Sequence, residues 1–513
     1  MSIPALAALA GASATISLAS CGSDAPPSAP GGDAGSDGYV IPLPSAPQIL
    51  GVRVEGGQIR QGSGAAPSST PAVVYLSGAK LDEISSVTVG DALRGTIVRN
   101  TSAEIVFAIN VPHGAPLGVH GVKIVGPGGT ASVANAVTIT PITVAPTGTD
   151  GGPDAKAYDG TNDHPFRSLK RAFSLAQAGD TVLLKDGVHE VANDDAVPRG
   201  GEPNVPAGIT IKGQSAAAKL VGPRKVGCAQ PTARYAFVLA GDTQLQGLDV
   251  SEFCTAILAK AGTVSVRDVR LHDMGEHGIQ AMGTAKITLE NVDAKNNAEA
   301  GLMVLDTARV TVVNGHFIGN GSWGIHMVGV GPLTVTGTEI GENGSPGDPE
   351  SSGIWTHNDS APVSVSITNG NFHDNPRNAL IFQNDKGGSA SVTDSFFKGH
   401  RFVGLAIGGG SSADVIRVRG STFVASPIYL NGAPVDFGTP ASPGGNTFED
   451  MSIDDDRGPE LRLPVTVSGN VWRRTGSSQQ PPAGCWAESK LPFWHLSNPG
   501  SCSSPATDNV IIN

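Results

Sequence analysis

Apolar residues return at a nearly regular interval along the second half of the chain. Most of them follow a small residue, and the interval is about 25 residues. A repeat of this length predicts one structural unit stacked many times, because a single unit cannot bury its own apolar face. The repeating positions are Ile279, Leu302, Ile325, Ile354, Leu380, Leu405, Ile428 and Ile453. A second apolar series runs in phase with the first, through Phe317, Ile340, Phe372, Phe396, Phe423 and Phe448.

Short runs of alternating apolar and polar residues lie between these two series, as in 309–313 and 362–367. Such alternation predicts strands with one buried face. Clusters of Asn, Asp and Gly between the runs are typical of corners, and Asn297, Asn320 and Asn375 are placed to stack as a hydrogen-bonded ladder. No long run in this region keeps a helical period. We therefore expect an all-β protein whose main domain is a parallel β-helix.

The repeat resembles the right-handed parallel β-helix superfamily, the pectin-lyase-like fold, across roughly the last two-thirds of the chain. The residues just upstream, 144–150 and 159–189, resemble the N-terminal cap module of bacterial β-helix proteins in a family of unknown function. There Pro165 suits a first helical turn, and Gly179 suits the end of the helix. We expect a capping helix near 165–178, with an apolar stripe of Phe166, Leu169, Phe173 and Ala176. The resemblance implies a fold and not an activity.

Residues 46–140 have a different pattern, with short apolar runs separated by Gly and Pro turns, which predicts a β-sandwich. The stretch Val111-Pro-His-Gly114, with Gly118 and Gly128-Gly129, resembles the immunoglobulin-like IPT/TIG module, and that resemblance implies a spacer. We expect the following organisation: a signal peptide over 1–20, a flexible tether over 21–45, the sandwich over 46–140, a linker and cap module over 141–204, the β-helix over 205–472, and a disulfide-containing tail over 473–513.

The N-terminal segment has the pattern of a sorting signal. Residues 3–19 are small and apolar, and the tetrapeptide Leu18-Ala-Ser-Cys21 that ends this segment resembles a bacterial lipobox, which implies a lipid on Cys21 after cleavage. No Lys or Arg precedes the apolar run, which departs from the usual pattern. Residues 22–38, rich in Gly, Ser, Pro and Asp, are typical of a tether. Gly22 after the cysteine implies the outer membrane or cell surface. An apolar N-terminus with an incidental cysteine is the alternative.

Charge and cysteine content limit the partners. The formal net charge of −12, without a basic run, argues against a nucleic-acid partner. Four cysteines remain after Cys21, and an even number in an exported protein predicts two disulfides. One pair would be Cys228 with Cys254, which lie one coil apart, and the other Cys485 with Cys502 in the tail. A metal site is the rival interpretation, but no Cys-x-x-Cys pair is present.

Aligning the coils on the inward aliphatic positions predicts which side chains face outward. His326 and Trp355 directly follow such positions and therefore point away from the core. Asp359 and Asp385 lie one coil apart in the sequence, so that stacking brings them side by side. We expect one patch across neighbouring coils, formed by Trp323, His326, Trp355, His357, Asn358, Asp359, Gln383, Asn384 and Asp385.

This patch has two interpretations. In the functional one it binds a saccharide: Trp355 offers an exposed aromatic face, and the amides bind hydroxyl groups. Asp359 and Asp385 would hold a calcium ion or act as acid and base, with His357 as a further catalytic candidate. The two carboxylates repel each other, and a bound cation would relieve that repulsion. In the structural interpretation Trp355 covers the rod, and Asn and Asp are ordinary corner residues. No motif indicates a cofactor beyond Ca²⁺.

Three classes of function stay open. The ordered motif set of polygalacturonases and the Asp-Pro-His-Asp string of mannuronan epimerases are absent, and Lys386 beside Asp385 is the single hint of a lyase base. We therefore expect a lipid-anchored surface protein that recognises polysaccharide or serves as an adhesion or envelope scaffold. The alternatives are a polysaccharide lyase, hydrolase or epimerase, and a purely structural envelope protein.

Overall fold

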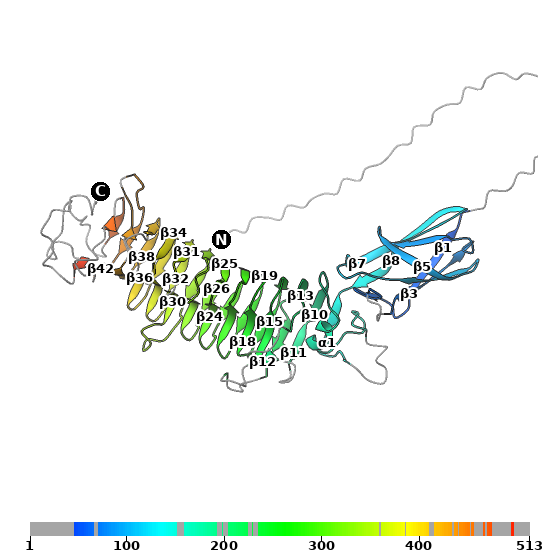
Figure 1. The fold of residues 1–513 in the computed structure, drawn as a ribbon, viewed down its shortest axis with the longest axis horizontal. Coiled ribbons are helices and arrows are strands. Elements are labelled where there is room, and N and C mark those ends of the chain that lie inside the picture. Colours follow the sequence, from blue (N-terminus) through cyan, green and yellow to red (C-terminus); the bar gives the residue numbers. More distant parts are fainter. Residues whose placement is uncertain are drawn as a thin grey trace, which may run out of the picture. The chain divides into compact units, whose positions relative to one another are not determined.

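Figure 1 shows the fold of the chain in a computed structural model. The structure describes residues 46–65, 70–150, 159–191, 197–198, 204–223, 228, 234–358, 361–384, 386–409, 415–432, 435–439, 441–451, 453–455, 465–466, 469–473 and 494–496. Cys21, Asp359, Asp385, Cys485 and Cys502 lie outside these residues. In the described part of the chain, no helix is long and apolar enough to cross a membrane.

The first folded region is a β-sandwich-like sheet of eight strands, connected in the order β1-β3-β6-β5-β4-β7-β8-β2. Alternating apolar residues of these strands point to one shared core, in which Leu76, Phe107 and Ile124 are fully buried. This agrees with the expected sandwich-like fold. The strands are β1 (Gln48–Val54), β2 (Ile59–Arg60), β3 (Ala72–Ala79), β4 (Ser86–Val89), β5 (Leu93–Asn100), β6 (Glu104–Ile109), β7 (Gly118–Gly126) and β8 (Gly129–Thr140).

The capping helix is shorter than expected, because α1 covers only Leu169–Phe173. Ser168 caps it by accepting a hydrogen bond from the Arg171 backbone N–H at 3.2 Å. Phe166 is not helical: its backbone N–H donates to the Thr143 carbonyl at 2.9 Å, as part of an isolated bridge to Val144. The expected stripe is nonetheless the buried side of this segment, with Phe166, Phe173 and Ala176 in the core and Leu169 packed against it. Backbone pairing with the preceding strand thus overrides the helical period at the start of the segment.

From β9 onward, the chain coils through three sheets, named here sheets I, II and III, whose strands pair in parallel except for the antiparallel pair β12 and β15; this confirms the right-handed parallel β-helix (Figure 1). Sheet I contains β9 (Ile142–Val144), β10 (Thr181–Leu184), β13 (Ile209–Gly213), β16 (Thr243–Gln246), β19 (Thr263–Arg267), β22 (Lys286–Glu290), β25 (Arg309–Val313), β28 (Leu333–Thr336), β31 (Val363–Thr368), β34 (Gly388–Thr393), β37 (Val415–Arg419), β40 (Val435–Asp436) and β43 (Val465–Thr466).

From β10 onward, each coil contributes one strand to every sheet. Sheet II contains β11 (Gly187–Glu190), β14 (Ala218–Val221), β17 (Asp249–Ser251), β20 (Arg270–His272), β23 (Asp293–Lys295), β26 (His316–Ile318), β29 (Glu339–Gly341), β32 (Asn371–His373), β35 (Phe396–Lys398), β38 (Thr422–Val424), β41 (Thr447–Glu449) and β44 (Val471–Arg473). Sheet III contains β12 (Val197–Pro198), β15 (Arg234–Leu239), β18 (Thr255–Ala259), β21 (His277–Ala281), β24 (Ala300–Val304), β27 (Trp323–Met327), β30 (Ser352–Asn358), β33 (Asn378–Asn384), β36 (Val403–Gly409), β39 (Ile428–Gly432), β42 (Ile453–Asp455) and β45 (Trp494–Leu496).

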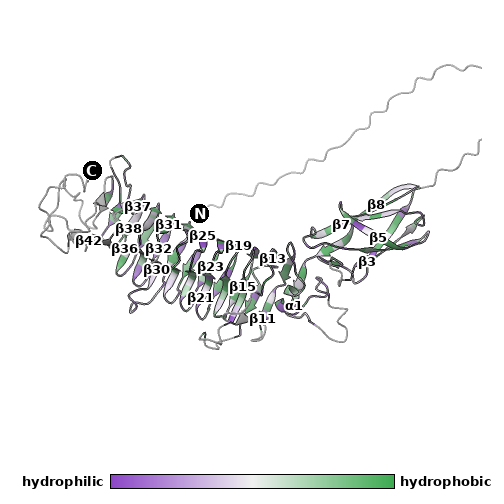
Figure 2. Cartoon of the chain, viewed as in Figure 1, coloured by the Kyte–Doolittle hydropathy of each residue, from purple (hydrophilic) through white to green (hydrophobic). Residues whose placement is uncertain are grey.

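From Ile279 to Ile428, the first apolar series forms the buried column of sheet III. Ile325, for example, pairs in register with Ile354, and both are fully buried. The hydropathy colouring of Figure 2 shows hydrophobic residues recurring from one strand to the next along the coils. The second series was predicted correctly except at one position: Phe397, not Phe396, lies in the core, where it stacks on Phe372 at 4.6 Å. Phe396 is 38% exposed because neighbouring residues of a strand face opposite sides.

Buried asparagines form the expected ladder at the corner between sheets II and III. Asn297 donates to Asn320 at 2.8 Å, Asn320 to Asn343 at 2.9 Å, and Asn343 to Asn375 at 3.2 Å. In the next coil His400 occupies the ladder position, and one of its ring nitrogens lies 3.2 Å from the Phe372 carbonyl oxygen. Each amide is thereby satisfied by the adjacent coil.

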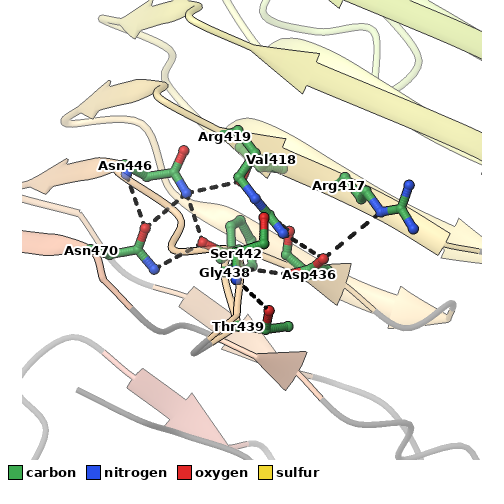
Figure 3. Close-up of polar contacts among 10 residues, drawn as sticks. Arg417, Val418, Arg419, Asp436, Gly438, Thr439, Ser442, Asn446 and Asn470 are labelled. Carbon is green, nitrogen blue, oxygen red and sulfur yellow. Dashed lines mark hydrogen bonds and ion pairs between the residues drawn. The ribbon is translucent and has the colours of Figure 1, made fainter. Parts of the chain in front are cut away.

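A second polar corner joins sheets I and II near the end of the described β-helix (Figure 3). The Asn446 amide donates to the carbonyls of Val418 and Phe437, both at 3.0 Å, and to the Asn470 side chain at 2.9 Å. Next to it, Arg419 pairs with Asp436 at 2.6 Å. These bonds fix the chain where it leaves sheet I.

Cys228 and Cys254 form a disulfide, with their Cα atoms 5.4 Å apart and a sequence separation of 26 residues. One coil brings the two cysteines into range, as the repeat length predicts. The second pair, Cys485 with Cys502, lies outside the described residues and stays a prediction.

Candidate functional site

The outer face of sheet III brings together most of the residues predicted from the sequence. Ile325 and Met327 are in the core, so His326 between them points outward. Backbone pairing places His326 beside Trp355, and His357 beside Gln383. The same outward position on successive coils is occupied by Leu258, Gln280, Met303, His326, Trp355, Ile381, Ala406 and Tyr429.

Four rings from two adjacent coils pack against one another on this face. This aromatic cluster consists of Trp323, His326, Trp355 and His357. The His326 and Trp355 rings are parallel within 1° with centroids 4.7 Å apart, and Trp355 stacks on His357 at 5.3 Å. Trp323 leans over both inner rings, with its centroid 4.2 Å from His326 and 5.7 Å from Trp355.

The prediction that Trp355 offers an exposed face is wrong. Trp355 is only 7% exposed, as is His326, because the rings of the cluster cover one another. Trp323 and His357 are half-buried and form the accessible part of the cluster. Gln383 is also half-buried, one coil further on. The backbones of Asn358 and Asn384 pair in register, but their side chains lie outside the described set.

A hydrogen bond holds Trp323 in place. Its indole N–H donates to the carbonyl of Glu350 at 2.9 Å, in the loop between β29 and β30. Asn378 holds the same loop by donating to the Ser351 carbonyl at 3.1 Å. The loop is long because the coil from Ile325 to Ile354 contains more residues than the coils before it. An insertion at this corner therefore positions the accessible tryptophan.

The inner rings have polar atoms without hydrogen-bond partners. Both ring nitrogens of His326 and the indole nitrogen of Trp355 are buried and unpaired, as is the Ser352 hydroxyl. Burial lowers the pKa of His326 to about 4, and the nearby His277 and His357 add to this shift. His326 is therefore neutral at physiological pH, which fits its buried position against two indoles.

The contacts of the aromatic cluster do not test the predicted calcium site. Asp359 and Asp385, the two expected calcium ligands, lie outside the described residues, so that a calcium ion held by this pair stays a prediction. Among the residues that the structure describes, no group of three or more His, Cys, Asp or Glu side chains is arranged to hold a metal ion.

A second polar surface, on the outer face of sheet II, was missed by the sequence reasoning. His272 lies between Asp249 at 2.8 Å and Asp273 at 2.6 Å. The hydrogen bond to Asp249 raises the pKa of His272 to about 9, against the effect of burial, and Asp273 raises it further. The signal was present in the sequence, because Asp249 and His272 are separated by the length of one coil.

The same sheet carries a longer row of paired groups. His316 lies 2.6 Å from Asp293 and 3.8 Å from Glu339. Glu339 is in turn 3.0 Å from His373, which also contacts Asp374 at 3.2 Å. The row follows the stacking direction and links strands of four successive coils.

A cavity of about 640 Å³ lies beside the disulfide. Its lining combines the charged residues Arg234, Glu252 and Asp273 with the apolar Phe253 and Met274. Apart from the two cysteines, it contains none of the residues predicted to act in function.

A protein-family model agrees with this architecture. Residues 255–423 match the model of a family described as right handed beta helix region. The chain is similar to the solved structure of pectate lyase Pel9A, with 15% identity over 69% of this chain and 85% of that one, at a TM-score of 0.37. It is also similar to the A-module of the Azotobacter vinelandii mannuronan C-5 epimerase AlgE6, with 12% identity over 72% and 98% of the two chains and a TM-score of 0.41.

A third similar structure is the catalytic unit of the GH87 α-1,3-glucanase from Streptomyces thermodiastaticus strain HF3-3, with 12% identity over 84% of this chain and 94% of that one and a TM-score of 0.39. Among curated proteins, no sequence matches the chain. The similarity to the solved structures concerns the fold, and the site described above comes from the residues of this chain.

Proposed function

We propose that the protein recognises a polysaccharide through the outer face of sheet III, at the surface of a bacterial cell. The observation that carries this proposal is the aromatic cluster, in which four rings from two coils gather on one outer face and leave Trp323 partly accessible. Aromatic rings in accessible positions bind the apolar faces of sugars, and polar groups around them bind hydroxyls.

The sheet provides a surface suited to an extended chain. Trp323 and Gln383 lie on strands β27 and β33, which are two steps apart in sheet III. Adjacent strands are separated by about 4.8 Å, so the two residues are offset by about 10 Å along the solenoid. Trp323 is in register with Asn378, and Gln383 lies five residues further along that strand, which adds about 16 Å across the sheet. Both are half-buried, and a bound saccharide would contact the indole at one end and the amide at the other. His357 lies between them on β30.

The surface location rests on the N-terminal sequence. The lipobox-like Leu18-Ala-Ser-Cys21 would attach the chain to a membrane, and residues 22–38 would act as its tether. The sandwich then serves as a spacer between the tether and the β-helix. The net charge of −12 is compatible with a neutral glycan or with an acidic glycan bound through a cation.

A binding screen tests the proposal. The full chain is applied to immobilised polysaccharides of varied sugar and charge, and the variant Trp323→Ala is compared with Phe396→Ala. Phe396 is the matched control because it is an exposed aromatic residue on sheet II. We expect Trp323→Ala to weaken binding about tenfold, the effect of removing a central aromatic contact, and Phe396→Ala to leave binding unchanged. Equal losses in both variants, or no ligand in the whole screen, would contradict the proposal.

The same screen distinguishes recognition from turnover. Each polysaccharide that binds is incubated with the chain and assayed for unsaturated ends by ultraviolet absorbance and for new reducing ends. Binding without either product supports recognition. Unsaturated ends would identify a lyase and new reducing ends alone a hydrolase, and either result would replace the recognition function.

A further inference from the structure

His326 occupies an unusual position in the aromatic cluster. Its ring contacts two tryptophans that also contact each other, with the Trp323 centroid at 4.2 Å, the Trp355 centroid at 4.7 Å and the two indole centroids 5.7 Å apart. It is 7% exposed, and both ring nitrogens are buried without a hydrogen-bond partner. A buried histidine normally has at least one satisfied nitrogen, as His400 has through the Phe372 carbonyl. The packing of His326 therefore depends on its ring being uncharged.

The groups around His326 offer no compensation for a positive charge. On the preceding side, β21 contributes His277, which pairs with Glu299 at 3.6 Å. On the following side, β30 contributes His357, and both histidines oppose a charge on His326. The intervening strand β24 contributes the uncharged Met303 in register with His326.

In the other described elements packed against His326, no carboxylate is hydrogen-bonded to its ring. The next strand, β33, brings the uncharged Ile381 and Gln383 to this face. The loop between β29 and β30 carries Asp348 and Glu350, and it contacts the cluster through the Glu350 carbonyl, which is occupied by the Trp323 indole. A proton on His326 would thus create a buried charge without a partner, which is costly.

We propose that the aromatic cluster is a proton-operated latch, in which protonation of His326 separates the rings and releases Trp323 from the loop before β30. The closed cluster holds a neutral imidazole packed against two indoles. In the open cluster the imidazolium reaches water, and the Trp323 side chain loses its fixed orientation. The rest of the coil is unaffected, because Ile325 and Met327 keep the strand in the core.

The direction of the pH effect follows from the two states. An exposed histidine has a pKa of about 6.5, whereas that of His326 in the closed cluster is lowered to about 4. The open state therefore binds the proton more readily, and the closed state loses stability as the pH falls from about 6.5 to about 4. Between pH 7 and pH 4 the ratio of open to closed clusters rises by on the order of a hundredfold. One further consequence rests on the proposed function. If the aromatic cluster binds a saccharide, lowering the pH weakens saccharide binding.

The latch can be tested without a ligand. Tryptophan emission and near-ultraviolet circular dichroism of the full chain are followed from pH 7.5 to pH 3.5, with far-ultraviolet circular dichroism as the measure of the fold. We expect a reversible shift of the tryptophan signals between about pH 6 and pH 4, before any loss of strand signal. His326→Phe keeps a flat ring and cannot be protonated, so it should abolish the shift. His326→Gln is the second variant and should give the open signal at every pH.

His400→Asn is the matched control. His400 is also buried, with its pKa lowered to about 4 by burial, but it lies in the asparagine ladder, where Asn is the native residue of the preceding coils. This variant should keep the tryptophan shift. A shift that persists in His326→Phe, or one that His400→Asn removes equally, would overturn the latch in favour of general acid unfolding. Failure to bind any glycan at pH 7 would refute the proposed function and leave the latch standing.

Discussion

At the scale of single residues, a buried polar group in this β-helix is stable where the neighbouring coil supplies its partner. Asn320 donates to the Ala294 carbonyl at 3.0 Å and to Asn343 at 2.9 Å, and its own carbonyl oxygen accepts from the Asn297 amide at 2.8 Å. The same oxygen accepts from the Asn297 backbone N–H at 3.1 Å. One side chain thus satisfies groups on both adjacent coils.

Removal of the Asn320 side chain measures the contribution of the ladder. Asn320→Ala removes the side-chain partner of the Asn297 backbone N–H and of the Ala294 carbonyl, and it leaves the Asn297 amide only a hydrogen bond of 3.4 Å to the Leu271 carbonyl. Each buried polar group left unpaired costs about 1–3 kcal/mol. We expect a loss of about 3 kcal/mol or more in the free energy of unfolding, measured by urea titration. Asn371→Ala, at an exposed position of β32, should change it by less than about 0.5 kcal/mol. Similar values for the two variants would show that the ladder contributes nothing.

At the scale of secondary-structure elements, the column of aromatic residues in sheet II connects four coils. Phe372, Phe397, Phe423 and Phe448 are buried and stack with centroids 4.6, 4.5 and 5.6 Å apart. Adjacent residues of a strand face opposite sides of the sheet, so Phe396 and Phe397 have opposite environments. This pair isolates the contribution of burial from that of residue type.

We expect Phe397→Ala to destabilise the protein by about 3–5 kcal/mol, because it removes a ring stacked on both faces and leaves a cavity in the column. Phe396→Ala removes the same side chain from a position that is 38% exposed, and should cost about 1 kcal/mol or less. Thermal unfolding of the two variants under identical conditions gives the comparison. A larger destabilisation by Phe396→Ala than by Phe397→Ala would show that Phe396, and not Phe397, lies in the core.

The period of the repeat predicted the β-helix because every coil buries an aliphatic residue at the same place. The same period did not distinguish Phe396 from Phe397, since both fit an interval of about one coil, and only backbone pairing fixes which of them faces inward. The sequence repeat also did not predict that Trp355 is buried. Its position on the outer face was predicted correctly, but its covering depends on the orientations of the Trp323, His326 and His357 rings.

In the candidate site, too, the coil spacing predicts which residues share a face, whereas the contacts between their side chains depend on packing. Coil spacing brought His326, Trp355 and Gln383 to one face, as the structure has them. The hydrogen bond from Trp323 to the Glu350 carbonyl depends on the conformation of an inserted loop, which no periodicity specifies. The spacing of Asp293 and His316 in sheet II matches one coil, but without the strand register it does not distinguish a bonded pair from two separate surface charges.

At the scale of the whole molecule, the proposed role depends on where the chain is held. A β-helix that recognises polysaccharide from a cell surface requires an attachment, and the sequence indicates one at Leu18-Ala-Ser-Cys21. A lipid on this cysteine would bury apolar chains in the membrane, at about 0.8 kcal/mol for each buried CH₂ group. Residues 22–38, which lack large apolar side chains apart from prolines, would leave the folded regions free to face outward.

The last prediction follows from this attachment. Cells that express the full chain with a radiolabelled or clickable fatty acid should show a labelled protein, and Cys21→Ala should abolish the label because the modified sulfur is absent. Globomycin, which blocks the lipoprotein signal peptidase, should leave a larger, uncleaved precursor. Cys485→Ala is the control for labelling at cysteines in general and should retain the lipid. Labelling of Cys21→Ala at the level of the parent protein would show that the anchor lies elsewhere, and the surface role would then need another basis.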